Sequence, residues 1–362
     1  MKRPFNFSAG PATLPEAVLE QAAAEMSDWH GRGLSVMEMS HRSADFESIL
    51  GQTESDLRDL LSVPPSYRVL FVQASATALN AIIPMNLVAR TGQAAMIDAV
   101  HTGVWSGKSL EEARKYTHVN IAATSEPENF TRIPAPERWQ LTHGAAYVHI
   151  CSNETINGTE FFFDPDTGSV PLVADMSSHI LSRPVDIEKY GLIFAGAQKN
   201  MGIAGMSVVI IRDDLMGHAL PVCPSVYDFS NLAAHHSIPN TPPVYAIYIC
   251  GLVFQWLKKQ GGVTAMEAAA IRKSTLLYDC IDSSSLFVNP VEKSCRSRMN
   301  VPFFLRDETL NDAFLTGAAQ NGLLQLQGHR SLGGMRASLY NALPVAGVEK
   351  LVAFMREFER AH

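Results

Sequence analysis

A lysine and an aspartate stand at the ends of two short apolar runs, an unusual environment for charged side chains. Lys199 follows the run Leu192–Ala195 in LIFAGAQKNMGIAG, where Gly196 breaks the run and a turn begins. Burial at such a place disfavours the charge of an amine and lowers its pKa, which makes the amine a nucleophile. Asp175 ends the preceding apolar run, Pro171–Asp175 (PLVAD). If the two runs are strands of one parallel sheet, the amine and the carboxylate lie at the same edge.

Pyridoxal phosphate requires such a pair. A lysine captures its aldehyde, and a carboxylate keeps the pyridine nitrogen protonated so that the ring accepts electrons. The structural alternative is a solvated loop lysine, because most lysines are exposed. The interpretation therefore depends on a phosphate site and a stacking aromatic residue elsewhere in the chain.

Groups suited to those tasks follow three further apolar runs. The turn Gln73–Ala78 (QASATA) consists of small residues before a helix, where backbone N–H groups and the helix dipole favour a phosphate. Trp105 could stack on a flat ring, and Thr155 in CSNETING could donate to a phenolic oxygen. Taken singly, the turn is equally well explained as a capped helix start. A core tryptophan and a turn threonine are the favoured explanations of Trp105 and Thr155 taken alone. Together, the strand ends suit one phosphorylated aromatic aldehyde.

The elements that must position these residues form an alternating pattern. The expected strands are Arg68–Val72, Ala94–Asp98, Ala146–Ile150, Pro171–Asp175, Leu192–Ala195 and Met206–Ile211. Helical or loop stretches separate them, which predicts an α/β fold with a mainly parallel sheet and ligands beyond the carboxyl ends of the strands. After the Pro-rich SIPNTPP the pattern changes to helices with a few short strands. We expect a large cofactor-binding domain over 16–260 and a smaller α+β domain built from 1–15 and 261–362.

Composition and charge exclude several classes of function. The chain has 362 residues, 46% of them apolar, and a net charge of −7, which argues against nucleic acid or an anionic membrane as the main partner. No apolar run approaches the roughly 20 residues of a membrane span, and no signal peptide is expected. Five scattered cysteines without a CxxC pair predict reduced thiols in the cytoplasm. No metal is expected, since the sequence has no HExxH and His235 and His236 are adjacent.

Motifs along nearly the whole chain carry a family resemblance. They are FNFSAGPATLP, SVMEMSHRS, NETINGTEF, ADMSSHILSRP, GAQKNMGIAG, NTPP, SRMNVPF and GHRSLGGMRASLYNA. On these motifs the chain resembles the phosphoserine aminotransferases, a family of class V, fold-type I pyridoxal-phosphate-dependent aminotransferases. The resemblance implies a homodimer that transfers the amino group of L-glutamate to 3-phosphohydroxypyruvate, giving O-phospho-L-serine and 2-oxoglutarate. It also implies the phosphohydroxythreonine step of pyridoxine biosynthesis.

The resemblance also implies a role for each site residue. Lys199 would be the Schiff-base lysine and Asp175 the partner of the pyridine nitrogen, with Trp105 stacking on the ring and Thr155 binding its 3′-oxygen. The cofactor phosphate would be bound by Ala76, Thr77 and Gln198, joined by Asn240 and Thr241 from the other subunit. Arg42 and Arg336 would bind substrate carboxylates, and His41, His329 and Arg330 would bind the substrate phosphate. Ala9, where some relatives have serine, would also lie in the substrate site.

One departure from the family pattern leaves an alternative open. Many relatives have a glycine-rich phosphate turn, whereas this chain has Ala74-Ser75-Ala76-Thr77. If the turn needs positive φ, these residues would change cofactor affinity or substrate preference. A class V aminotransferase for unphosphorylated serine or alanine is therefore the alternative enzyme. A cofactor-binding sensor or scaffold without turnover is the non-enzymatic one.

Overall fold

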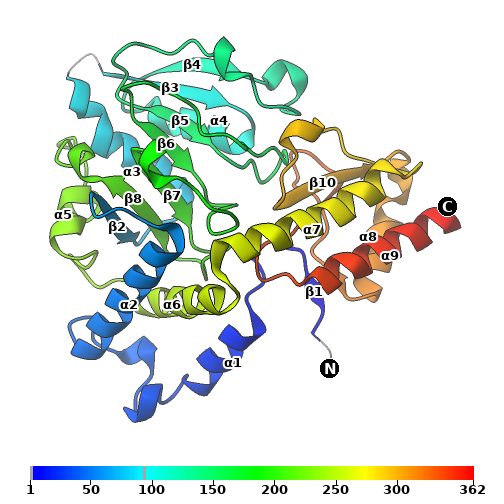
Figure 1. Ribbon diagram of the computed structural model, residues 1–362, viewed down its shortest axis with the longest axis horizontal. Helices are drawn as coiled ribbons and strands as arrows, with labels where there is room; N and C mark the ends of the chain where they lie inside the picture. Colours follow the sequence, from blue (N-terminus) through cyan, green and yellow to red (C-terminus); the bar gives the residue numbers. More distant parts are fainter. Residues whose placement is uncertain (1–2, 93–94) are drawn as a thin grey trace.

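The computed structural model describes residues 3–92 and 95–362. Its largest element is a seven-stranded sheet in the order β2-β8-β7-β6-β5-β3-β4 (Figure 1). The strands are β2 Tyr67–Val72, β3 Met96–His101, β4 His118–Thr124, β5 Val148–Cys151, β6 Leu172–Asp175, β7 Leu192–Gly196 and β8 Ser207–Arg212. Only β8 among them runs antiparallel to its neighbours, β2 and β7. The predicted α/β fold with a mainly parallel sheet is confirmed.

Helices cover both faces of the sheet, so its strands are apolar throughout rather than alternating. On β8, Val208 and Ile210 pack into the core that contains helices α2 (Ala44–Leu61) and α6 (Val244–Lys259). Val209 and Ile211 point to the opposite core, which contains α3 (Ala76–Leu87) and α5 (Phe229–Ala234). Helices α1 (Glu16–Ala24) and α4 (Val104–Ala113) complete this part of the chain. Among the residues that the structure describes, no helix is long and apolar enough to cross a membrane.

Two strands differ from their sequence prediction. The edge strand β4 (HVNIAAT) was not predicted, because its polar and half-exposed residues lack the continuous apolar run of the central strands. Strand β3 runs to His101, beyond the predicted end at Asp98, since its last residues pair with β4 across an irregularity after Ala99. The predicted start at Ala94 lies outside the described residues.

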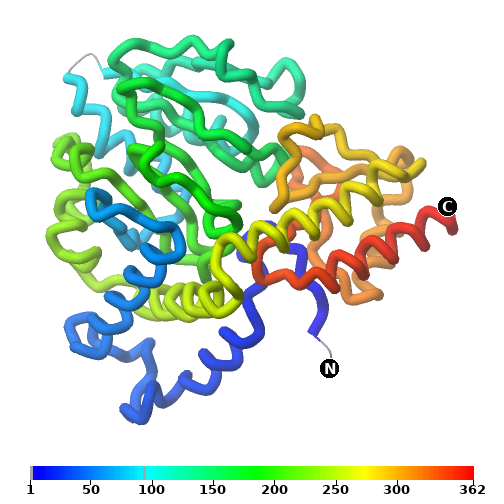
Figure 2. Tube along the Cα trace, viewed as in Figure 1, coloured from blue at the N-terminus to red at the C-terminus, as the bar shows by residue number. Residues whose placement is uncertain are grey.

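The C-terminal part of the chain forms a separate core. Its elements are α7 Gly262–Asp282, β9 Phe287–Val288, β10 Asn300–Leu305, α8 Asn311–Gln320, β11 Leu323–Leu324, β12 Met335–Ser338 and α9 Val345–Ala361. Strands β12, β10 and β9 form an antiparallel sheet. Strand β1 (Phe5–Asn6) joins this part by pairing with β11, and Figure 2 shows the N-terminal trace beside the C-terminal segment.

The arrangement of the cores supports the predicted division of the chain, which stays a prediction. Phe7 packs in the C-terminal core, far in sequence from its neighbours there. Helix α7 spans the boundary, because Met266 belongs to the core of the large sheet and Leu277 to the C-terminal core. Residues 1 and 2 of the predicted small domain lie outside the described residues.

Candidate active site

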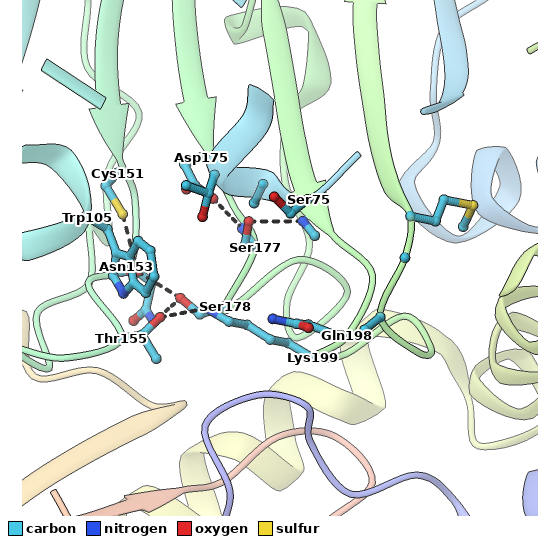
Figure 3. Close-up of a pocket in the computed structure, with 16 residues that line it drawn as sticks. Ser75, Trp105, Cys151, Asn153, Thr155, Asp175, Ser177, Ser178, Gln198 and Lys199 are labelled. Carbon is cyan, nitrogen blue, oxygen red and sulfur yellow. Dashed lines mark hydrogen bonds between the residues drawn. The ribbon is translucent and has the colours of Figure 1, made fainter. Parts of the chain in front are cut away.

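The carboxyl ends of β6 and β7 bring Asp175 and Lys199 into one cavity. The two strands pair in parallel, so the residues that end or follow them lie at the same edge of the sheet. The cavity is open to solvent and has about 600 Å³ of empty space, and Asp175, Lys199, Trp105 and Thr155 all line it. Figure 3 shows the Lys199 side chain extended toward Thr155, with Asp175 at the end of its strand on the other side of the cavity. The predicted juxtaposition of amine and carboxylate is present.

Lys199 is held by contacts from three segments. Its Nζ donates a hydrogen bond to Thr155 Oγ1 over 2.7 Å and lies 5.8 Å from the centre of the Trp105 ring. The N-terminal turn closes over it at Gly10, whose φ of 143° favours glycine. Burial lowers the pKa of Lys199, and the charge of Asp175 acts in the opposite direction. The amine is therefore closer to its neutral, nucleophilic form than a solvated lysine.

Asp175 is buried with one of its oxygens fixed. Its side chain accepts a hydrogen bond from the Ser177 N–H over 2.8 Å, and Ser177 Oγ accepts the Gly196 N–H over 3.0 Å. Burial raises the pKa of Asp175, while hydrogen bonds from Ser177 and the charge of Lys199 lower it. A cationic ring nitrogen in the cavity would add a charge that favours the carboxylate further.

Two buried residues, Ser152 and His179, form a hydrogen-bond chain to the backbone of Asp175. Ser152 Oγ donates to the carbonyl oxygen of Asp175 over 2.8 Å and lies 2.7 Å from His179 Nε2. Because the single hydroxyl proton goes to the carbonyl, His179 must carry its proton on Nε2 and donate to Ser152. Burial holds the pKa of His179 well below its usual range, so the ring is neutral.

The phosphate turn is an ordinary helix start. Ser75 is the N-cap of α3, with φ −80° and a side chain that accepts the Ala78 N–H over 3.2 Å. None of the residues Ala74–Thr77 has positive φ. The N–H groups of Ala76 and Thr77 belong to the first helical turn, which leaves them free of intrahelical partners and open to an anion. The absence of glycine in this turn therefore causes no backbone strain.

A second helix, α4, also begins at this edge, but a protein carboxylate occupies its N-terminus. Glu154 is fully buried and accepts hydrogen bonds from Trp105 N (3.0 Å), Ser106 N (2.8 Å) and Ser106 Oγ (2.7 Å). Gly103 precedes the helix, and a β-carbon there would lie 2.4 Å from Glu154 Cδ. Glu154 thus positions Trp105 and leaves the N-terminus of α3 as the available anion site. Sequence reasoning missed this residue because a loop glutamate carries no signal of burial.

Several predicted substrate residues come from the C-terminal part. Arg336 on β12 donates from Nη1 to the carbonyl oxygen of Thr155 over 3.3 Å, and burial lowers its pKa. His329 and Arg330 lie in the loop before β12, and the charges of Arg336 and Arg330 help burial to lower the pKa of His329. The carbonyl oxygen of Ala9 accepts a hydrogen bond from Tyr340 over 2.8 Å. The predicted cofactor residue Gln198 lines the cavity.

Eight predicted site residues do not line this cavity. Four of them are Ala9, His329, Arg330 and Arg336, and the other four are Asn240, Thr241, His41 and Arg42. Asn240, Thr241 and Arg42 are exposed and His41 is half-buried, and none of them lines the cavity that holds Lys199. A single chain therefore does not bring the whole predicted set together.

Other polar residues line the cavity without having been predicted. Asn153 donates to Ser178 Oγ over 2.7 Å and to Asn300 Oδ1 over 2.9 Å, and it accepts from Ser297 Oγ over 2.6 Å. These bonds tie the loop that carries Thr155 to strand β10. Asn153 lies in the motif NETINGTEF and Ser178 in the motif ADMSSHILSRP, but only the fold shows what these residues contact.

The residues that line the cavity fit pyridoxal phosphate. The cavity supplies an amine for the aldehyde, a buried carboxylate for the pyridine nitrogen, an indole ring beside the amine, and a helix N-terminus for the phosphate. The indole N–H of Trp105 is buried without an acceptor among the described residues, which leaves a donor beside the same cavity.

Comparisons with known proteins agree with this site. The family model "Aminotransferase class-V" matches residues 4–351. A protein from Herminiimonas arsenicoxydans, called phosphoserine aminotransferase, is 60% identical over the full length of both chains. The solved phosphoserine aminotransferase from Bacillus circulans subsp. alkalophilus is 43% identical with a TM-score of 0.97, covering 100% of this chain and 99% of its own. The PLP-bound phosphoserine aminotransferase from Trichomonas vaginalis is 42% identical with a TM-score of 0.94, covering 98% of this chain and 100% of its own.

The fold and the site thus define a pyridoxal-phosphate-dependent aminotransferase, and the chain belongs to the class V aminotransferases. Within that class it belongs to the phosphoserine aminotransferase family, which serves serine biosynthesis. The predicted family, enzyme class and cofactor are confirmed. The roles of the individual site residues remain predictions.

Proposed function

We propose that this chain transfers the amino group of L-glutamate to 3-phosphohydroxypyruvate, giving 2-oxoglutarate and O-phospho-L-serine. The observation that carries the proposal is the cavity that Lys199, Asp175 and Thr155 share, together with the hydrogen bond from Arg336 to the carbonyl oxygen of Thr155. Arg336 offers a planar pair of donors that suits a carboxylate, and His329 and Arg330 in the same segment suit a phosphate. The ordinary helix geometry of Ser75–Thr77 removes the reason to favour an unphosphorylated substrate.

The chain's own residues provide the binding and proton-transfer steps. Pyridoxal phosphate, when bound, supplies an electron-accepting ring and an aldehyde carbon that stores the amino group between two half-reactions. Lys199 would hold the cofactor through Nζ, and its amine would serve as the general base that takes the α-proton of the substrate. Asp175 would hold a proton at the ring nitrogen, and Thr155 would donate to the phenolic oxygen. Trp105 would pack against the ring and exclude water from one face.

The absorbance of the purified, cofactor-loaded enzyme tests the first half-reaction. Adding L-glutamate should bleach the visible band, and adding 3-phosphohydroxypyruvate should restore it. A yellow protein whose spectrum does not respond to glutamate would instead support a sensor or scaffold. Comparing O-phospho-L-serine with L-serine tests the substrate, because the cationic residues should make the phosphorylated amino acid strongly preferred.

Replacing the amine tests the assignment of Lys199. Lys199→Ala should abolish transamination, since neither the covalent attachment nor the general base remains. The control is Lys115→Ala, which removes an exposed lysine that pairs with Glu112 on the surface. Near-wild-type turnover by Lys199→Ala would rule out the mechanism.

We further propose a homodimer in which Asn240 and Thr241 complete the phosphate site of the partner chain. This proposal is supported by two observations. Asn240 and Thr241 are exposed, and neither of them lines the cavity of its own chain. His41 and Arg42 also lie outside their own chain's cavity, and we propose that they too reach the site of the partner chain. Closed two-fold dimers are the commonest assembly of soluble enzymes.

Mixing two inactive variants tests the shared site. A Lys199→Ala chain and an Asn240→Ala/Thr241→Ala chain should together regain about a quarter of wild-type activity after subunit exchange, because half of the dimers then carry one complete site. Failure to regain activity, with dimers seen by ultracentrifugation, would show that these residues act elsewhere.

We also propose activity on the phosphohydroxythreonine of pyridoxine biosynthesis, which presents the same carboxylate, amine and phosphate. The measurement is amino-group transfer to the corresponding keto acid.

A cytoplasmic location is our final proposal, supported by five unpaired cysteines. Fractionation of cells that express the chain would test it.

A further inference from the structure

A lysine on α4 lies beside Trp105, which lines the cavity, although neither the motifs nor the proposed reaction assigns this lysine a role. Lys108 lies one helical turn after Trp105, and its Nζ lies 4.5 Å from the centre of the Trp105 ring. Lys199 Nζ lies 5.8 Å from the centre of the same ring. The Lys108 amine is therefore held beside the indole that lines the cavity.

The charge of Lys108 has no partner among the described residues. Lys108 makes no ion pair and no side-chain hydrogen bond there, although it is half-buried. In the turn that follows α4, Lys115 is paired with Glu112, with 2.8 Å between Nζ and a carboxylate oxygen. The amine of Lys108 is therefore free to bind an anionic ligand.

Other cations face Lys108 from the C-terminal part of the chain. After burial, the charges of Arg336, Lys108 and Arg330 lower the pKa of His329. The buried carboxylate of Glu154 is already engaged by Trp105 and Ser106. Lys108 therefore adds to the positive potential that the cations of the loop before β12 and of β12 provide.

We propose that Lys108 is a specificity-determining residue that binds the phosphate of the substrate from α4, while His329 and Arg330 bind it from the loop before β12. This inference rests on the proposed function, because it assigns a further contact to the same substrate. It explains why α4 presents an unpaired cation beside Trp105. It also makes phosphate recognition depend on both parts of the chain.

Two substitutions separate charge from packing. Lys108→Met keeps an aliphatic chain on the indole and removes the charge, whereas Lys108→Arg keeps the charge. Lys115→Met, in the turn that follows α4, is the matched control. Each loaded enzyme is mixed with O-phospho-L-serine, L-glutamate or L-alanine, whose distal groups carry two, one and no negative charges, and the half-reaction is followed by absorbance.

We expect a loss that grows with the distal charge. In Lys108→Met, kcat/KM for phosphoserine should fall by about tenfold to a hundredfold, with a smaller loss for glutamate and a change under about twofold for alanine. Lys108→Arg should keep most of the activity on phosphoserine, and Lys115→Met should match wild type. Binding of inorganic phosphate to the loaded enzyme, measured by calorimetry, should weaken only in Lys108→Met.

Three outcomes would overturn the inference. Equal losses on all three amino acids would mean that Lys108 acts through Trp105 rather than through the phosphate. Unchanged kinetics together with unchanged phosphate binding would mean that it has no role. If wild type itself does not react with phosphoserine, the proposed function fails as well, so the two failures are distinguishable.

Discussion

At the scale of single residues, burial and mutual attraction act in opposite directions on Lys199 and Asp175. Burial lowers the pKa of the lysine and raises that of the aspartate, whereas each charge favours the ionised form of the other. The pair is thus prepared for both tasks of the proposed chemistry. The amine can lose its proton to become a nucleophile, and the carboxylate gains a stronger cationic partner when a pyridinium lies beside it.

Replacing the carboxylate by its amide isolates the charge of Asp175. Asp175→Asn should reduce turnover by about a hundredfold to a thousandfold, because a neutral amide cannot hold a proton on the ring nitrogen. The fold should be preserved, since the amide oxygen can still accept the Ser177 N–H. The measurement is the single-turnover rate with glutamate.

Asp279→Asn, an exposed change on α7, is the control for Asp175→Asn and should be silent. Retention of wild-type rates by Asp175→Asn would contradict the assigned role.

At the scale of elements, two helix N-termini meet the carboxyl edge of the sheet and serve different purposes. Helix α3 begins with an ordinary serine cap, whereas α4 begins on the buried carboxylate of Glu154. Both arrangements use the positive end of a helix dipole. Because the carboxylate of Glu154 already neutralises the positive end of α4, this helix positions Trp105 instead of binding the anion of a ligand.

We expect Glu154→Gln to lower the free energy of unfolding by about 1–3 kcal/mol, since an amide cannot accept all three hydrogen bonds from Trp105 and Ser106. Displacement of Trp105 should also weaken cofactor binding. Chemical denaturation and cofactor titration measure the two effects. The exposed change Glu111→Gln on the same helix should shift stability by less than about 0.5 kcal/mol. An unchanged affinity for the cofactor in Glu154→Gln would show that Trp105 does not depend on this cap.

At the scale of the whole molecule, hydrogen bonds beside the cavity connect the residues around the large sheet to the C-terminal part. Asn153 bonds to Asn300, Arg336 bonds to the Thr155 carbonyl, and Tyr340 bonds to Ala9. The N-terminal turn is fixed at both sides, since β1 pairs with β11 and the Ala12 N–H donates to the Gln198 carbonyl over 2.9 Å. The site therefore depends on the relative position of segments from both ends of the chain.

Buried neutral histidines predict how the stability of the molecule depends on pH. Burial lowers the pKa of His149 on β5 from 6.5 to about 4 and lowers that of His179 as well. Below pH 6.5 the unfolded chain binds protons that the folded chain does not, so stability falls as the pH falls toward 4. At pH 4, His149 alone should account for about 3 kcal/mol of the loss.

Denaturation between pH 7 and pH 4 measures this dependence. His149→Gln should flatten the pH dependence, whereas His118→Gln on the exposed edge strand should leave it unchanged. An unaltered slope in His149→Gln would contradict the prediction.

The sequence predicted the centre of the site well for a physical reason. A fully buried strand appears as a continuous apolar run, so Asp175 and Lys199 are recognisable as residues that end or follow strands. Strand β4 was missed because its half-exposed edge position requires no such run. Glu154 and Lys108 look like solvated charges in the sequence, and only their neighbours in space distinguish them.

By itself, the sequence determined the α/β fold, the family and the edge at which the amine and the carboxylate meet, because local apolar patterns and motifs encode strand ends. The tertiary structure alone decided that the N-terminus of α3 is free to bind an anion and that Lys108 is unpaired beside Trp105 among the described residues. It also decided which predicted residues lie outside their own chain's cavity. Those features depend on contacts between residues far apart in the chain, such as Glu154 with Ser106 or Asn153 with Asn300. A local sequence pattern does not identify a contact partner that lies far away in the sequence.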